Sequence, residues 1–397
     1  MSQSLSPEPT ETIPARAPTT RLHHLDALRG GALLLGVLLH ALMPFLPGGN
    51  WLVDDAHESW AAAGAVGVIH LFRMALFMML AGYFGHMVLH RRGVAAYVKD
   101  RLTRIGLPLV AFWPGLFALM IAAVVLNEVV RGAAPIAAAD TGPAATPGFL
   151  AVPTMHLWFL LLLLEIALVV VAVRAVLLRM LGTERAAGAA GRIGGALASP
   201  VGVVLAAVPY AAGLMVQESS DASIIEPYTL VPVAGASIGY SGAFLAGWFL
   251  RARSGSLARL ERQWIPQLVI AVLLSPLALA APMFVPALLT AAFAALAGWA
   301  WVYGLLGLTA RLVQRAIPWV RYLADASYWI YLVHFPLLLL VEVPLAALGA
   351  PILLQLAVAL IVVMAVLLLS YDLFVRSTWI GAWLNGHRRP RAVFVRR

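Results

Sequence analysis

Cysteine is absent from this chain of 397 residues, and charge is scarce. Without a thiol the protein can form neither a disulfide nor a thiolate metal site, and it cannot carry an acyl group on cysteine. Lys, Arg, Asp and Glu make up only 11% of the residues, whereas 62% are hydrophobic and the mean hydropathy is +0.90. Water-soluble domains do not have this composition, so the chain is predicted to be an integral membrane protein embedded in the lipid bilayer.

Other absences exclude further classes of protein. No glycine-rich phosphate loop is present, which argues against an ATP-driven pump. No internal repeat is visible, which argues against a transporter built from inverted repeats. The net charge is +9, but the basic residues stand between hydrophobic segments, where membrane topology explains them, so no nucleic-acid partner is expected. His86 and His90 have metal-compatible spacing but no carboxylate nearby, and no metal site is predicted.

What the chain does contain is a series of ten hydrophobic segments, each about 20 residues long, which is the length that crosses a bilayer. Their predicted limits are 25–46, 62–89, 105–127, 155–178, 195–216, 230–250, 264–281, 284–309, 322–346 and 350–373. We therefore predict an all-α, polytopic membrane protein with about ten transmembrane helices over residues 22–376. Residues 1–21 are predicted to be a disordered cytoplasmic tail, and residues 377–397 a basic cytoplasmic C-terminal tail.

The charges between the segments predict the orientation. Arginine gathers in alternate connections and at the C-terminal end, namely 90–104, 179–192, 251–262, 310–321 and 388–397. The other connections are poor in arginine and often acidic. By the positive-inside rule both termini are then expected in the cytoplasm, which an even number of spans requires.

The first segment carries two ionisable residues at an informative spacing. Arg29 and His40 are eleven residues apart, which is almost three helical turns, so they share a face with Asp26 and Gly36. The rise between Arg29 and His40 is roughly 16 Å, which places Arg29 at the membrane edge and His40 deep inside. Such a buried ionisable group is by default a functional hypothesis. The alternative is that Arg29, paired with Asp26, anchors the helix and His40 bonds a neighbouring helix.

Two further charges lie within apolar segments. Arg73 is expected either to form a salt bridge with a carboxylate such as Glu165 or to contact an anionic substrate. Glu165 lies in the fourth segment at roughly the depth of His40. It could stabilise an imidazolium at His40 or neutralise Arg73, and the sequence leaves both alternatives open.

Polar residues of two more segments reach the same region. His156 and Trp158 begin the fourth segment, where they are either an interfacial anchor or part of a site. Ser327, Tyr331 and His334 share one face of the ninth segment, and His334 lies near the middle of the membrane. Because several helices bring polar groups to one depth, a shared buried site is favoured over isolated core histidines.

Five stretches in this order resemble the membrane-bound acyltransferase 3 family, and within it the glucan biosynthesis type. They are residues 25–40 with an Arg, ten residues and a His; Phe72–Phe84; Arg101–Leu109; His156–Leu160; and Ser327–His334. The chain departs from that type at Ala81, where Ser is usual, and at Phe335, where a second His can follow His334.

The resemblance implies an acyl-CoA-dependent O-acyltransferase of the bacterial inner membrane. The donor would be cytoplasmic acyl-CoA, with succinyl-CoA expected, and the acceptor a hydroxyl of a periplasmic or cell-envelope glucan. No permanently bound cofactor and no metal are implied, and a homodimer stays open. His40 would be the general base or would carry a transient acyl group. Glu165 matches no acidic position of the family, so the prediction that it assists His40 rests on its depth alone. Substrate contacts are expected from Asp26, Arg29, Arg73, His156, Trp158, Ser327, Tyr331 and His334.

Two other functions remain as alternatives at this point. One is an acetyltransferase that acts on another surface glycan. The other is a secondary transporter or polysaccharide flippase that uses Glu165 and His40 as proton-relay groups.

Overall fold

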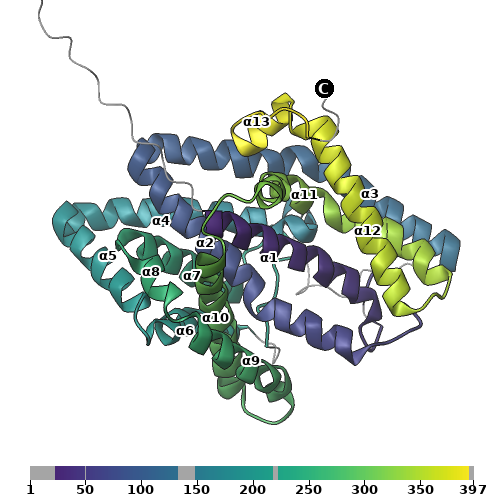
Figure 1. Cartoon of the computed structure of the whole chain (residues 1–397), viewed down its shortest axis with the longest axis horizontal. Coiled ribbons are helices and arrows are strands. Elements are labelled where there is room, and N and C mark those ends of the chain that lie inside the picture. Colours follow the sequence, from purple (N-terminus) through teal and green to yellow (C-terminus); the bar gives the residue numbers. More distant parts are fainter. Residues whose placement is uncertain (1–22, 50, 133–147, 218–221, 393–397) are drawn as a thin grey trace, which may run out of the picture.

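The computed structural model describes residues 23–49, 51–132, 148–217 and 222–392. Every regular element in these ranges is a helix, and the helices assemble into one bundle (Figure 1). In chain order the α-helices are α1 His23–Leu42, α2 Trp60–Arg101, α3 Leu107–Arg131, α4 Trp158–Leu181, α5 Thr183–Leu197, α6 Gly202–Val216, α7 Ala234–Ala252, α8 Ser256–Glu261, α9 Trp264–Ala280, α10 Ala287–Leu312, α11 Pro318–Ala347, α12 Ile352–Ser370 and α13 Trp379–Asn385. Short 3₁₀ and π turns extend or join them at η1 Met43–Phe45, η2 Leu102–Gly106, η3 Gly148–Ala151, η4 Met155–Leu157, η5 Ala281–Met283 and η6 Tyr371–Val375.

The all-helical fold agrees with the sequence prediction. By length and composition, seven helical stretches of the described chain can cross a membrane, or eight if the bent pair α5 and α6 forms one span. One of the seven, Trp60–Arg131, contains α2, η2 and α3 in succession. The number of ten crossings and the cytoplasmic location of both termini therefore stay predictions.

The fifth predicted segment differs from the structure. Residues 195–216 were expected to form one span, but the chain bends by 100° between α5 and α6. Pro200 lies in the bend, where it cannot continue a helix. The Tyr303 hydroxyl donates to the Leu197 carbonyl at 3.0 Å, which supplies a partner that the helix no longer provides. The expected connection 179–192 is also largely helical, because it contains the alanine-rich start of α5.

The C-terminal segment contains a short helix, and its cytoplasmic location stays a prediction. Residues 379–385 form α13, and its Trp383 ring stacks on Phe112 of α3 with ring centroids 5.8 Å apart. The Trp383 indole donates to the Thr103 carbonyl at 2.7 Å, and Arg389 forms an ion pair with Asp325 at 2.9 Å. The described part of residues 377–397 therefore packs onto the helical bundle.

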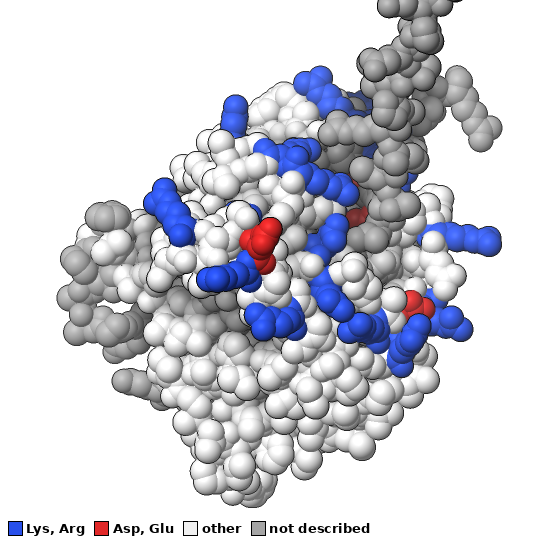
Figure 2. All heavy atoms as spheres, turned by 90° about the vertical axis from the view of Figure 1, so that its left-hand side faces the viewer, with Lys and Arg blue, Asp and Glu red and all other residues white. Residues whose placement is uncertain are grey.

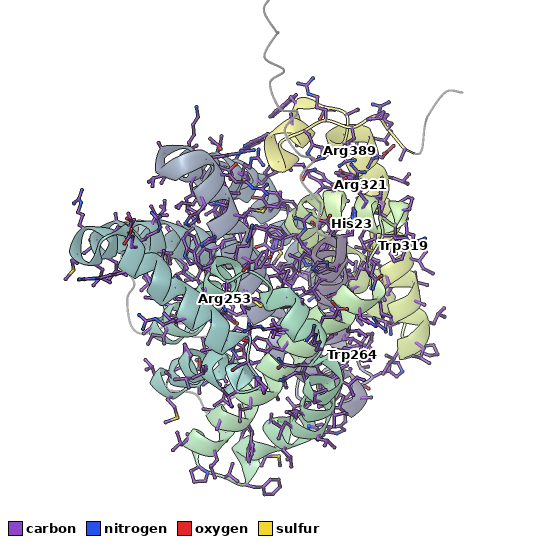
Figure 3. All side chains as sticks on the ribbon, turned by 60° about the vertical axis from the view of Figure 1, so that its left-hand side comes forward. His23, Arg253, Trp264, Trp319, Arg321 and Arg389 are labelled. Carbon is purple, nitrogen blue, oxygen red and sulfur yellow. The ribbon has the colours of Figure 1, made fainter. Side chains whose placement is uncertain are left out.

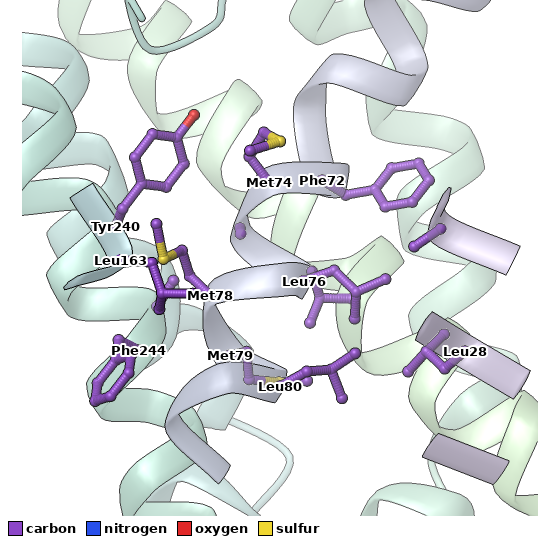
Figure 4. Close-up of a cluster of buried hydrophobic side chains, with 14 of the residues drawn as sticks. Leu28, Phe72, Met74, Leu76, Met78, Met79, Leu80, Leu163, Tyr240 and Phe244 are labelled. Atoms are coloured by element: carbon purple, nitrogen blue, oxygen red, sulfur yellow. The ribbon is translucent and has the colours of Figure 1, made fainter. Parts of the chain in front are cut away.

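Helix α2 lies at the centre of the packing, between α7 and α1 (Figure 4). Glycines let α2 and α7 approach at backbone distance, as small residues do between membrane helices. A Cβ atom at Gly82 would lie 1.9 Å from the Phe244 carbonyl oxygen, and one at Gly247 would lie 1.8 Å from that of Met79. Because α2 carries Arg73, this contact also fixes part of the site described below.

Gly82→Ala is expected to destabilise the bundle by about 1–3 kcal/mol, since the added methyl group must push two backbones apart. Thermal unfolding of the purified protein in detergent measures the effect as a lowered Tm. Gly64→Ala, on the same helix, is the control because nothing lies within 4 Å of the position that its methyl group would take. Equal Tm values for the two variants would contradict the proposed close contact.

Candidate functional site

The His40 ring lies in a group of aromatic rings at the end of α1. Its centroid is 5.3 Å from that of His334 and 4.8 Å from that of Phe335, both on α11. The Trp51 ring, from the loop after η1, stacks at 6.4 Å with an interplanar angle of 19°. His40 is partly accessible, and no hydrogen bond joins its ring to another described residue. The imidazole is therefore held by ring packing and keeps its nitrogens for other partners.

The other two histidines of this group are tied to the backbone. His156 of η4 makes a hydrogen bond from Nε2 to the Leu332 carbonyl at 2.9 Å. His334 makes hydrogen bonds from Nδ1 to the carbonyls of Tyr331 at 2.8 Å and Ile330 at 3.0 Å. Carbonyl oxygens only accept, so these nitrogens carry the protons, and the opposite ring nitrogen of each neutral histidine holds a lone pair.

Tyr331 completes the link between η4 and α11. Its hydroxyl donates to the His156 carbonyl at 2.6 Å, and the rings of His156 and His334 are 5.6 Å apart. His40, His156, Tyr331 and His334 are thus brought together as the sequence predicted. Helical periodicity determines the depth and the face of the residues on α1 and α11, which is why their grouping could be expected from the sequence.

Arg73 reaches the same group from α2. Only 6% of the residue is exposed, and a Cβ atom at Gly36 would lie 2.9 Å from its Nη1 atom. The glycine therefore lets the guanidinium lie against α1 one turn before His40. Among the described residues, none forms a hydrogen bond or an ion pair with Arg73, and its Nε is buried. A buried guanidinium without a partner is costly, which indicates that the site is built to receive an anion or a carbonyl oxygen.

Glu226 is the carboxylate that interacts most strongly with the charge of Arg73. The sequence alone did not indicate a role for Glu226 in the site. It lies in the connection between α6 and α7, interacts electrostatically with Arg73, and accepts a hydrogen bond from Trp158. Thr154 fastens this connection, because its Oγ1 donates to the Pro227 carbonyl at 2.6 Å and its backbone N–H donates to that of Tyr228 at 2.9 Å. The acidic residue in the connection between α6 and α7 was the available signal, but periodicity does not reveal that this connection packs against the site.

Glu165 does not join this group. The side chains that interact electrostatically with His40 are those of Arg73, His70, His156 and His334, and the carboxylate that does so with Arg73 is Glu226. Among the described residues, no hydrogen bond or ion pair involves Glu165. The expected salt bridge between Glu165 and Arg73 is therefore not formed, the carboxylate that acts electrostatically on Arg73 is Glu226, and a catalytic role for Glu165 has no geometric support.

Trp158 contacts residues around Arg73, namely Tyr240 and Glu226. Its ring lies 5.8 Å from that of Tyr240 of α7, and it is buried behind His156 at the start of α4. Its hydrogen bond to Glu226 makes it a support of the Arg73 environment. The expected direct substrate contact by Trp158 stays a prediction.

The remaining predicted residues form a second group at the opposite end of α1. Arg29 donates to the Ala324 carbonyl of α11, and the Ser327 hydroxyl donates to the same oxygen at 2.8 Å. Asp26 lies one turn before Arg29. These contacts connect the starts of α1 and α11, and Figure 3 shows His23, Arg321 and Arg389 near one another at this end. The structure thus separates Asp26, Arg29 and Ser327 from the histidine group.

The molecular surface at this end is basic. Figure 2 shows Lys and Arg gathered over the upper and middle part of the face that it views, with few acidic side chains among them, above a lower part without charged side chains. The ends of α2, α4, α7 and α10 each contribute arginines near helix termini, including Arg101, Arg179, Arg251 and Arg311. We call this surface the arginine-rich face. The loop that carries Trp51 lies at the opposite end of the bundle, where it connects the end of α1 with the start of α2.

Apolar helices around a buried arginine and three clustered histidines define a multi-pass membrane protein with a group of ionisable side chains inside its helical bundle. The chain belongs to the acyltransferase 3 family: the family model described as an acyltransferase domain matches residues 22–375. The protein is therefore a membrane acyltransferase.

Curated relatives match a smaller part of the chain. The glucans biosynthesis proteins C of Salmonella paratyphi B, Salmonella heidelberg and Salmonella enteritidis are each 32% identical over 97 residues. The match covers 24% of this chain and 25% of each relative, so the chain spans about a quarter of the length of the curated relatives it matches. No solved structure matches.

Proposed function

We propose that this protein transfers an acyl group from acyl-CoA to a hydroxyl group of a periplasmic or cell-envelope glucan, with His40 as the general base. The observation that carries the proposal is the pairing of a partly accessible His40 ring with a buried Arg73 beside it that has no hydrogen-bond partner among the described residues. Family membership supports acyl transfer, and the partial match to glucan biosynthesis proteins supports the acceptor class.

His40 is suited to the proton transfer that the reaction needs. One ring nitrogen takes the proton of the glucan hydroxyl while the hydroxyl oxygen attacks the thioester carbonyl carbon. A carbon–oxygen bond forms, the carbon–sulfur bond breaks, and the proton passes from the imidazolium to the departing thiolate. The products are the acylated acceptor and free CoA, so no other reactant is required. A transient acyl-His40 is the alternative route.

Arg73 supplies positive charge where the reaction needs it. Attack on the thioester places negative charge on the carbonyl oxygen, and a preorganised guanidinium in a dry site stabilises that charge. A succinyl donor also carries a terminal carboxylate, which an arginine binds in a bidentate manner. Tyr331 and His334 flank this position and are proposed to contact the carbonyl oxygen or the acceptor hydroxyl.

The donor is proposed to approach from the arginine-rich face (Figure 2). The phosphates of CoA are strongly anionic and are attracted to such a surface. Arg29, at the start of α1, is then on the path to His40, with Asp26 and Ser327 beside it. In this proposal the arginine-rich face is cytoplasmic, the protein lies in the bacterial inner membrane, and acyl-CoA is a substrate rather than a resident cofactor.

The purified protein in lipid nanodiscs, supplied with succinyl-CoA or acetyl-CoA, is expected to release free CoA only when a glucan acceptor is present. Thiol titration measures the CoA, and mass spectrometry of the glucan identifies the added group. A mass increase for one donor alone assigns the acyl class. If reconstituted vesicles accumulate glucan without CoA release, the protein is a transporter or flippase and the proposal is wrong.

A further inference from the structure

Residues 51–55, in the loop between η1 and α2, are fixed to helices far away in the sequence. The Trp51 backbone N–H donates to Asp54 Oδ1 at 3.0 Å. From α3, Asn127 donates to the Leu52 carbonyl at 3.3 Å and Arg131 donates to the Asp54 carbonyl. The loop that carries Trp51 is therefore held by side chains of α3.

Helix α12 holds the same loop through Asp55. The Gln355 amide donates to Asp55 Oδ2 at 2.9 Å, and the Asp55 backbone N–H donates to the Pro44 carbonyl at 2.9 Å. Burial favours a raised pKa for Asp55, but hydrogen bonds from the His57 backbone, Gln355 and the His57 ring outweigh it and hold the pKa below its usual value. Asp55 thus stays an acceptor at neutral pH and keeps the loop closed onto α12.

The hydrogen bonds from α3 and α12 hold the Trp51 ring beside the His40 ring. Trp51 lies 6.4 Å from the His40 ring and 5.7 Å from the Phe335 ring, and Val53 behind it is only 2% exposed. The Trp51 Nε1 is buried and has no hydrogen-bond partner among the described residues. A buried indole N–H normally has an acceptor, so this one indicates an acceptor atom supplied by a ligand.

We propose that Trp51 and Phe335 form the binding subsite for the acceptor sugar, with the Trp51 indole donating a hydrogen bond to a sugar oxygen. This inference rests on the proposed function and names the acceptor as a neutral hexopyranose unit. A pyranose ring presents a C–H face that packs on aromatic rings, and its hydroxyls and ring oxygen accept hydrogen bonds. Ligand sites commonly combine such apolar walls with a few placed polar groups.

The position of the subsite fits the direction of transfer. Trp51 belongs to the loop after α1, whereas Arg29 and the arginine-rich face lie at the start of that helix, roughly three turns before His40. Donor and acceptor would therefore approach His40 from opposite ends of α1. A sugar that packs on the Trp51 and Phe335 rings would bring a hydroxyl group to the imidazole.

Three variants test the subsite in the full-length protein. Trp51→Ala is expected to raise the KM for a neutral gluco-oligosaccharide about tenfold or more, and to leave the KM for acyl-CoA within about twofold. A tenfold change corresponds to about 1.4 kcal/mol, which is within the range of one aromatic contact and one hydrogen bond. Trp51→Phe keeps a ring but not the N–H, so an intermediate KM is expected. Trp60→Ala is the matched control, since Trp60 begins α2 and is 82% exposed.

A second measurement separates this inference from the proposed function. Calorimetric binding of the gluco-oligosaccharide, without acyl-CoA, is expected for the wild type and Trp60→Ala and lost in Trp51→Ala. If binding follows this pattern but no CoA is released, the subsite stands and the acyl-CoA proposal fails. If Trp51→Ala instead speeds acceptor-independent CoA release with an unchanged acceptor KM, Trp51 is a seal against water and the inference is overturned.

Discussion

Replacing His40 by alanine is expected to lower the rate of acyl transfer by on the order of 10²–10⁴-fold, the usual contribution of a general base. The protein should still insert and fold, because no hydrogen bond to another described residue is lost with the imidazole. The measurement is acceptor-dependent CoA release by purified variants at matched concentration, together with Tm.

His90→Ala is a suitable control for that experiment. His90 is exposed on α2, and it stacks on His86 with ring centroids 3.8 Å apart, in a separate group beside Trp248. This variant is expected to retain wild-type transfer. Wild-type amounts of acylated glucan from His40→Ala would remove His40 from the catalytic role.

The three histidines of the site are not equivalent, and the hydrogen bonds explain why His40 is the favoured base. His156 and His334 each donate to backbone carbonyls, which fixes their ring orientation and tautomer. His40 has no such bond within the described chain. Its ring nitrogens are therefore available to take a proton from an acceptor hydroxyl and give it to a thiolate, as the proposed transfer requires. The fixed histidines are better suited to orient a substrate than to carry a proton from one atom to another.

The parts of the site that lie on single helices could be predicted from the sequence. The spacing of Arg29 and His40 determines which face they share and how far apart they lie, and Tyr331 and His334 follow the same rule. The ring contacts show His40, Tyr331 and His334 packed together, while Arg29 lies at the opposite end of α1. Because the helical period alone determines which residues share a face, these positions can be predicted without knowing which helices pack together.

The residues that could not be predicted lie on connections. Trp51 and Glu226 enter the site because long-range hydrogen bonds, from Gln355 and Thr154, fold their loops back onto the helices. No periodic pattern encodes such bonds. Glu165 was favoured because depth along α4 can be counted, but depth does not determine which direction a side chain faces between packed helices. The same limitation applies to the bend between α5 and α6, where Pro200 interrupts an otherwise apolar run.

Arg73→Ala is expected to lower kcat/KM by on the order of 10²–10³-fold, as the loss of an oxyanion donor does. Arg73→Lys keeps the charge but loses the planar fork, so it should recover only part of the rate. Comparing donors separates the two roles of the guanidinium. If Arg73 stabilises the thioester oxyanion, succinyl and acetyl transfer fall equally. If it binds the acyl carboxylate, succinyl transfer falls and acetyl transfer is largely retained.

The Tm of the Arg73 variants must be measured together with their transfer rates, because it distinguishes a catalytic role of Arg73 from a structural one. A structural salt bridge at this depth would cost several kcal/mol when one partner is removed. Arg73 has no hydrogen bond or ion pair in the described chain and interacts with Glu226 only electrostatically, so Arg73→Ala should lower Tm far less than the loss of such a salt bridge would. Arg92→Ala, also on α2 but largely exposed, should change neither rate nor Tm. A variant of Arg73 that unfolds early, with transfer falling only in proportion to folded protein, would show that the guanidinium supports the fold rather than the reaction.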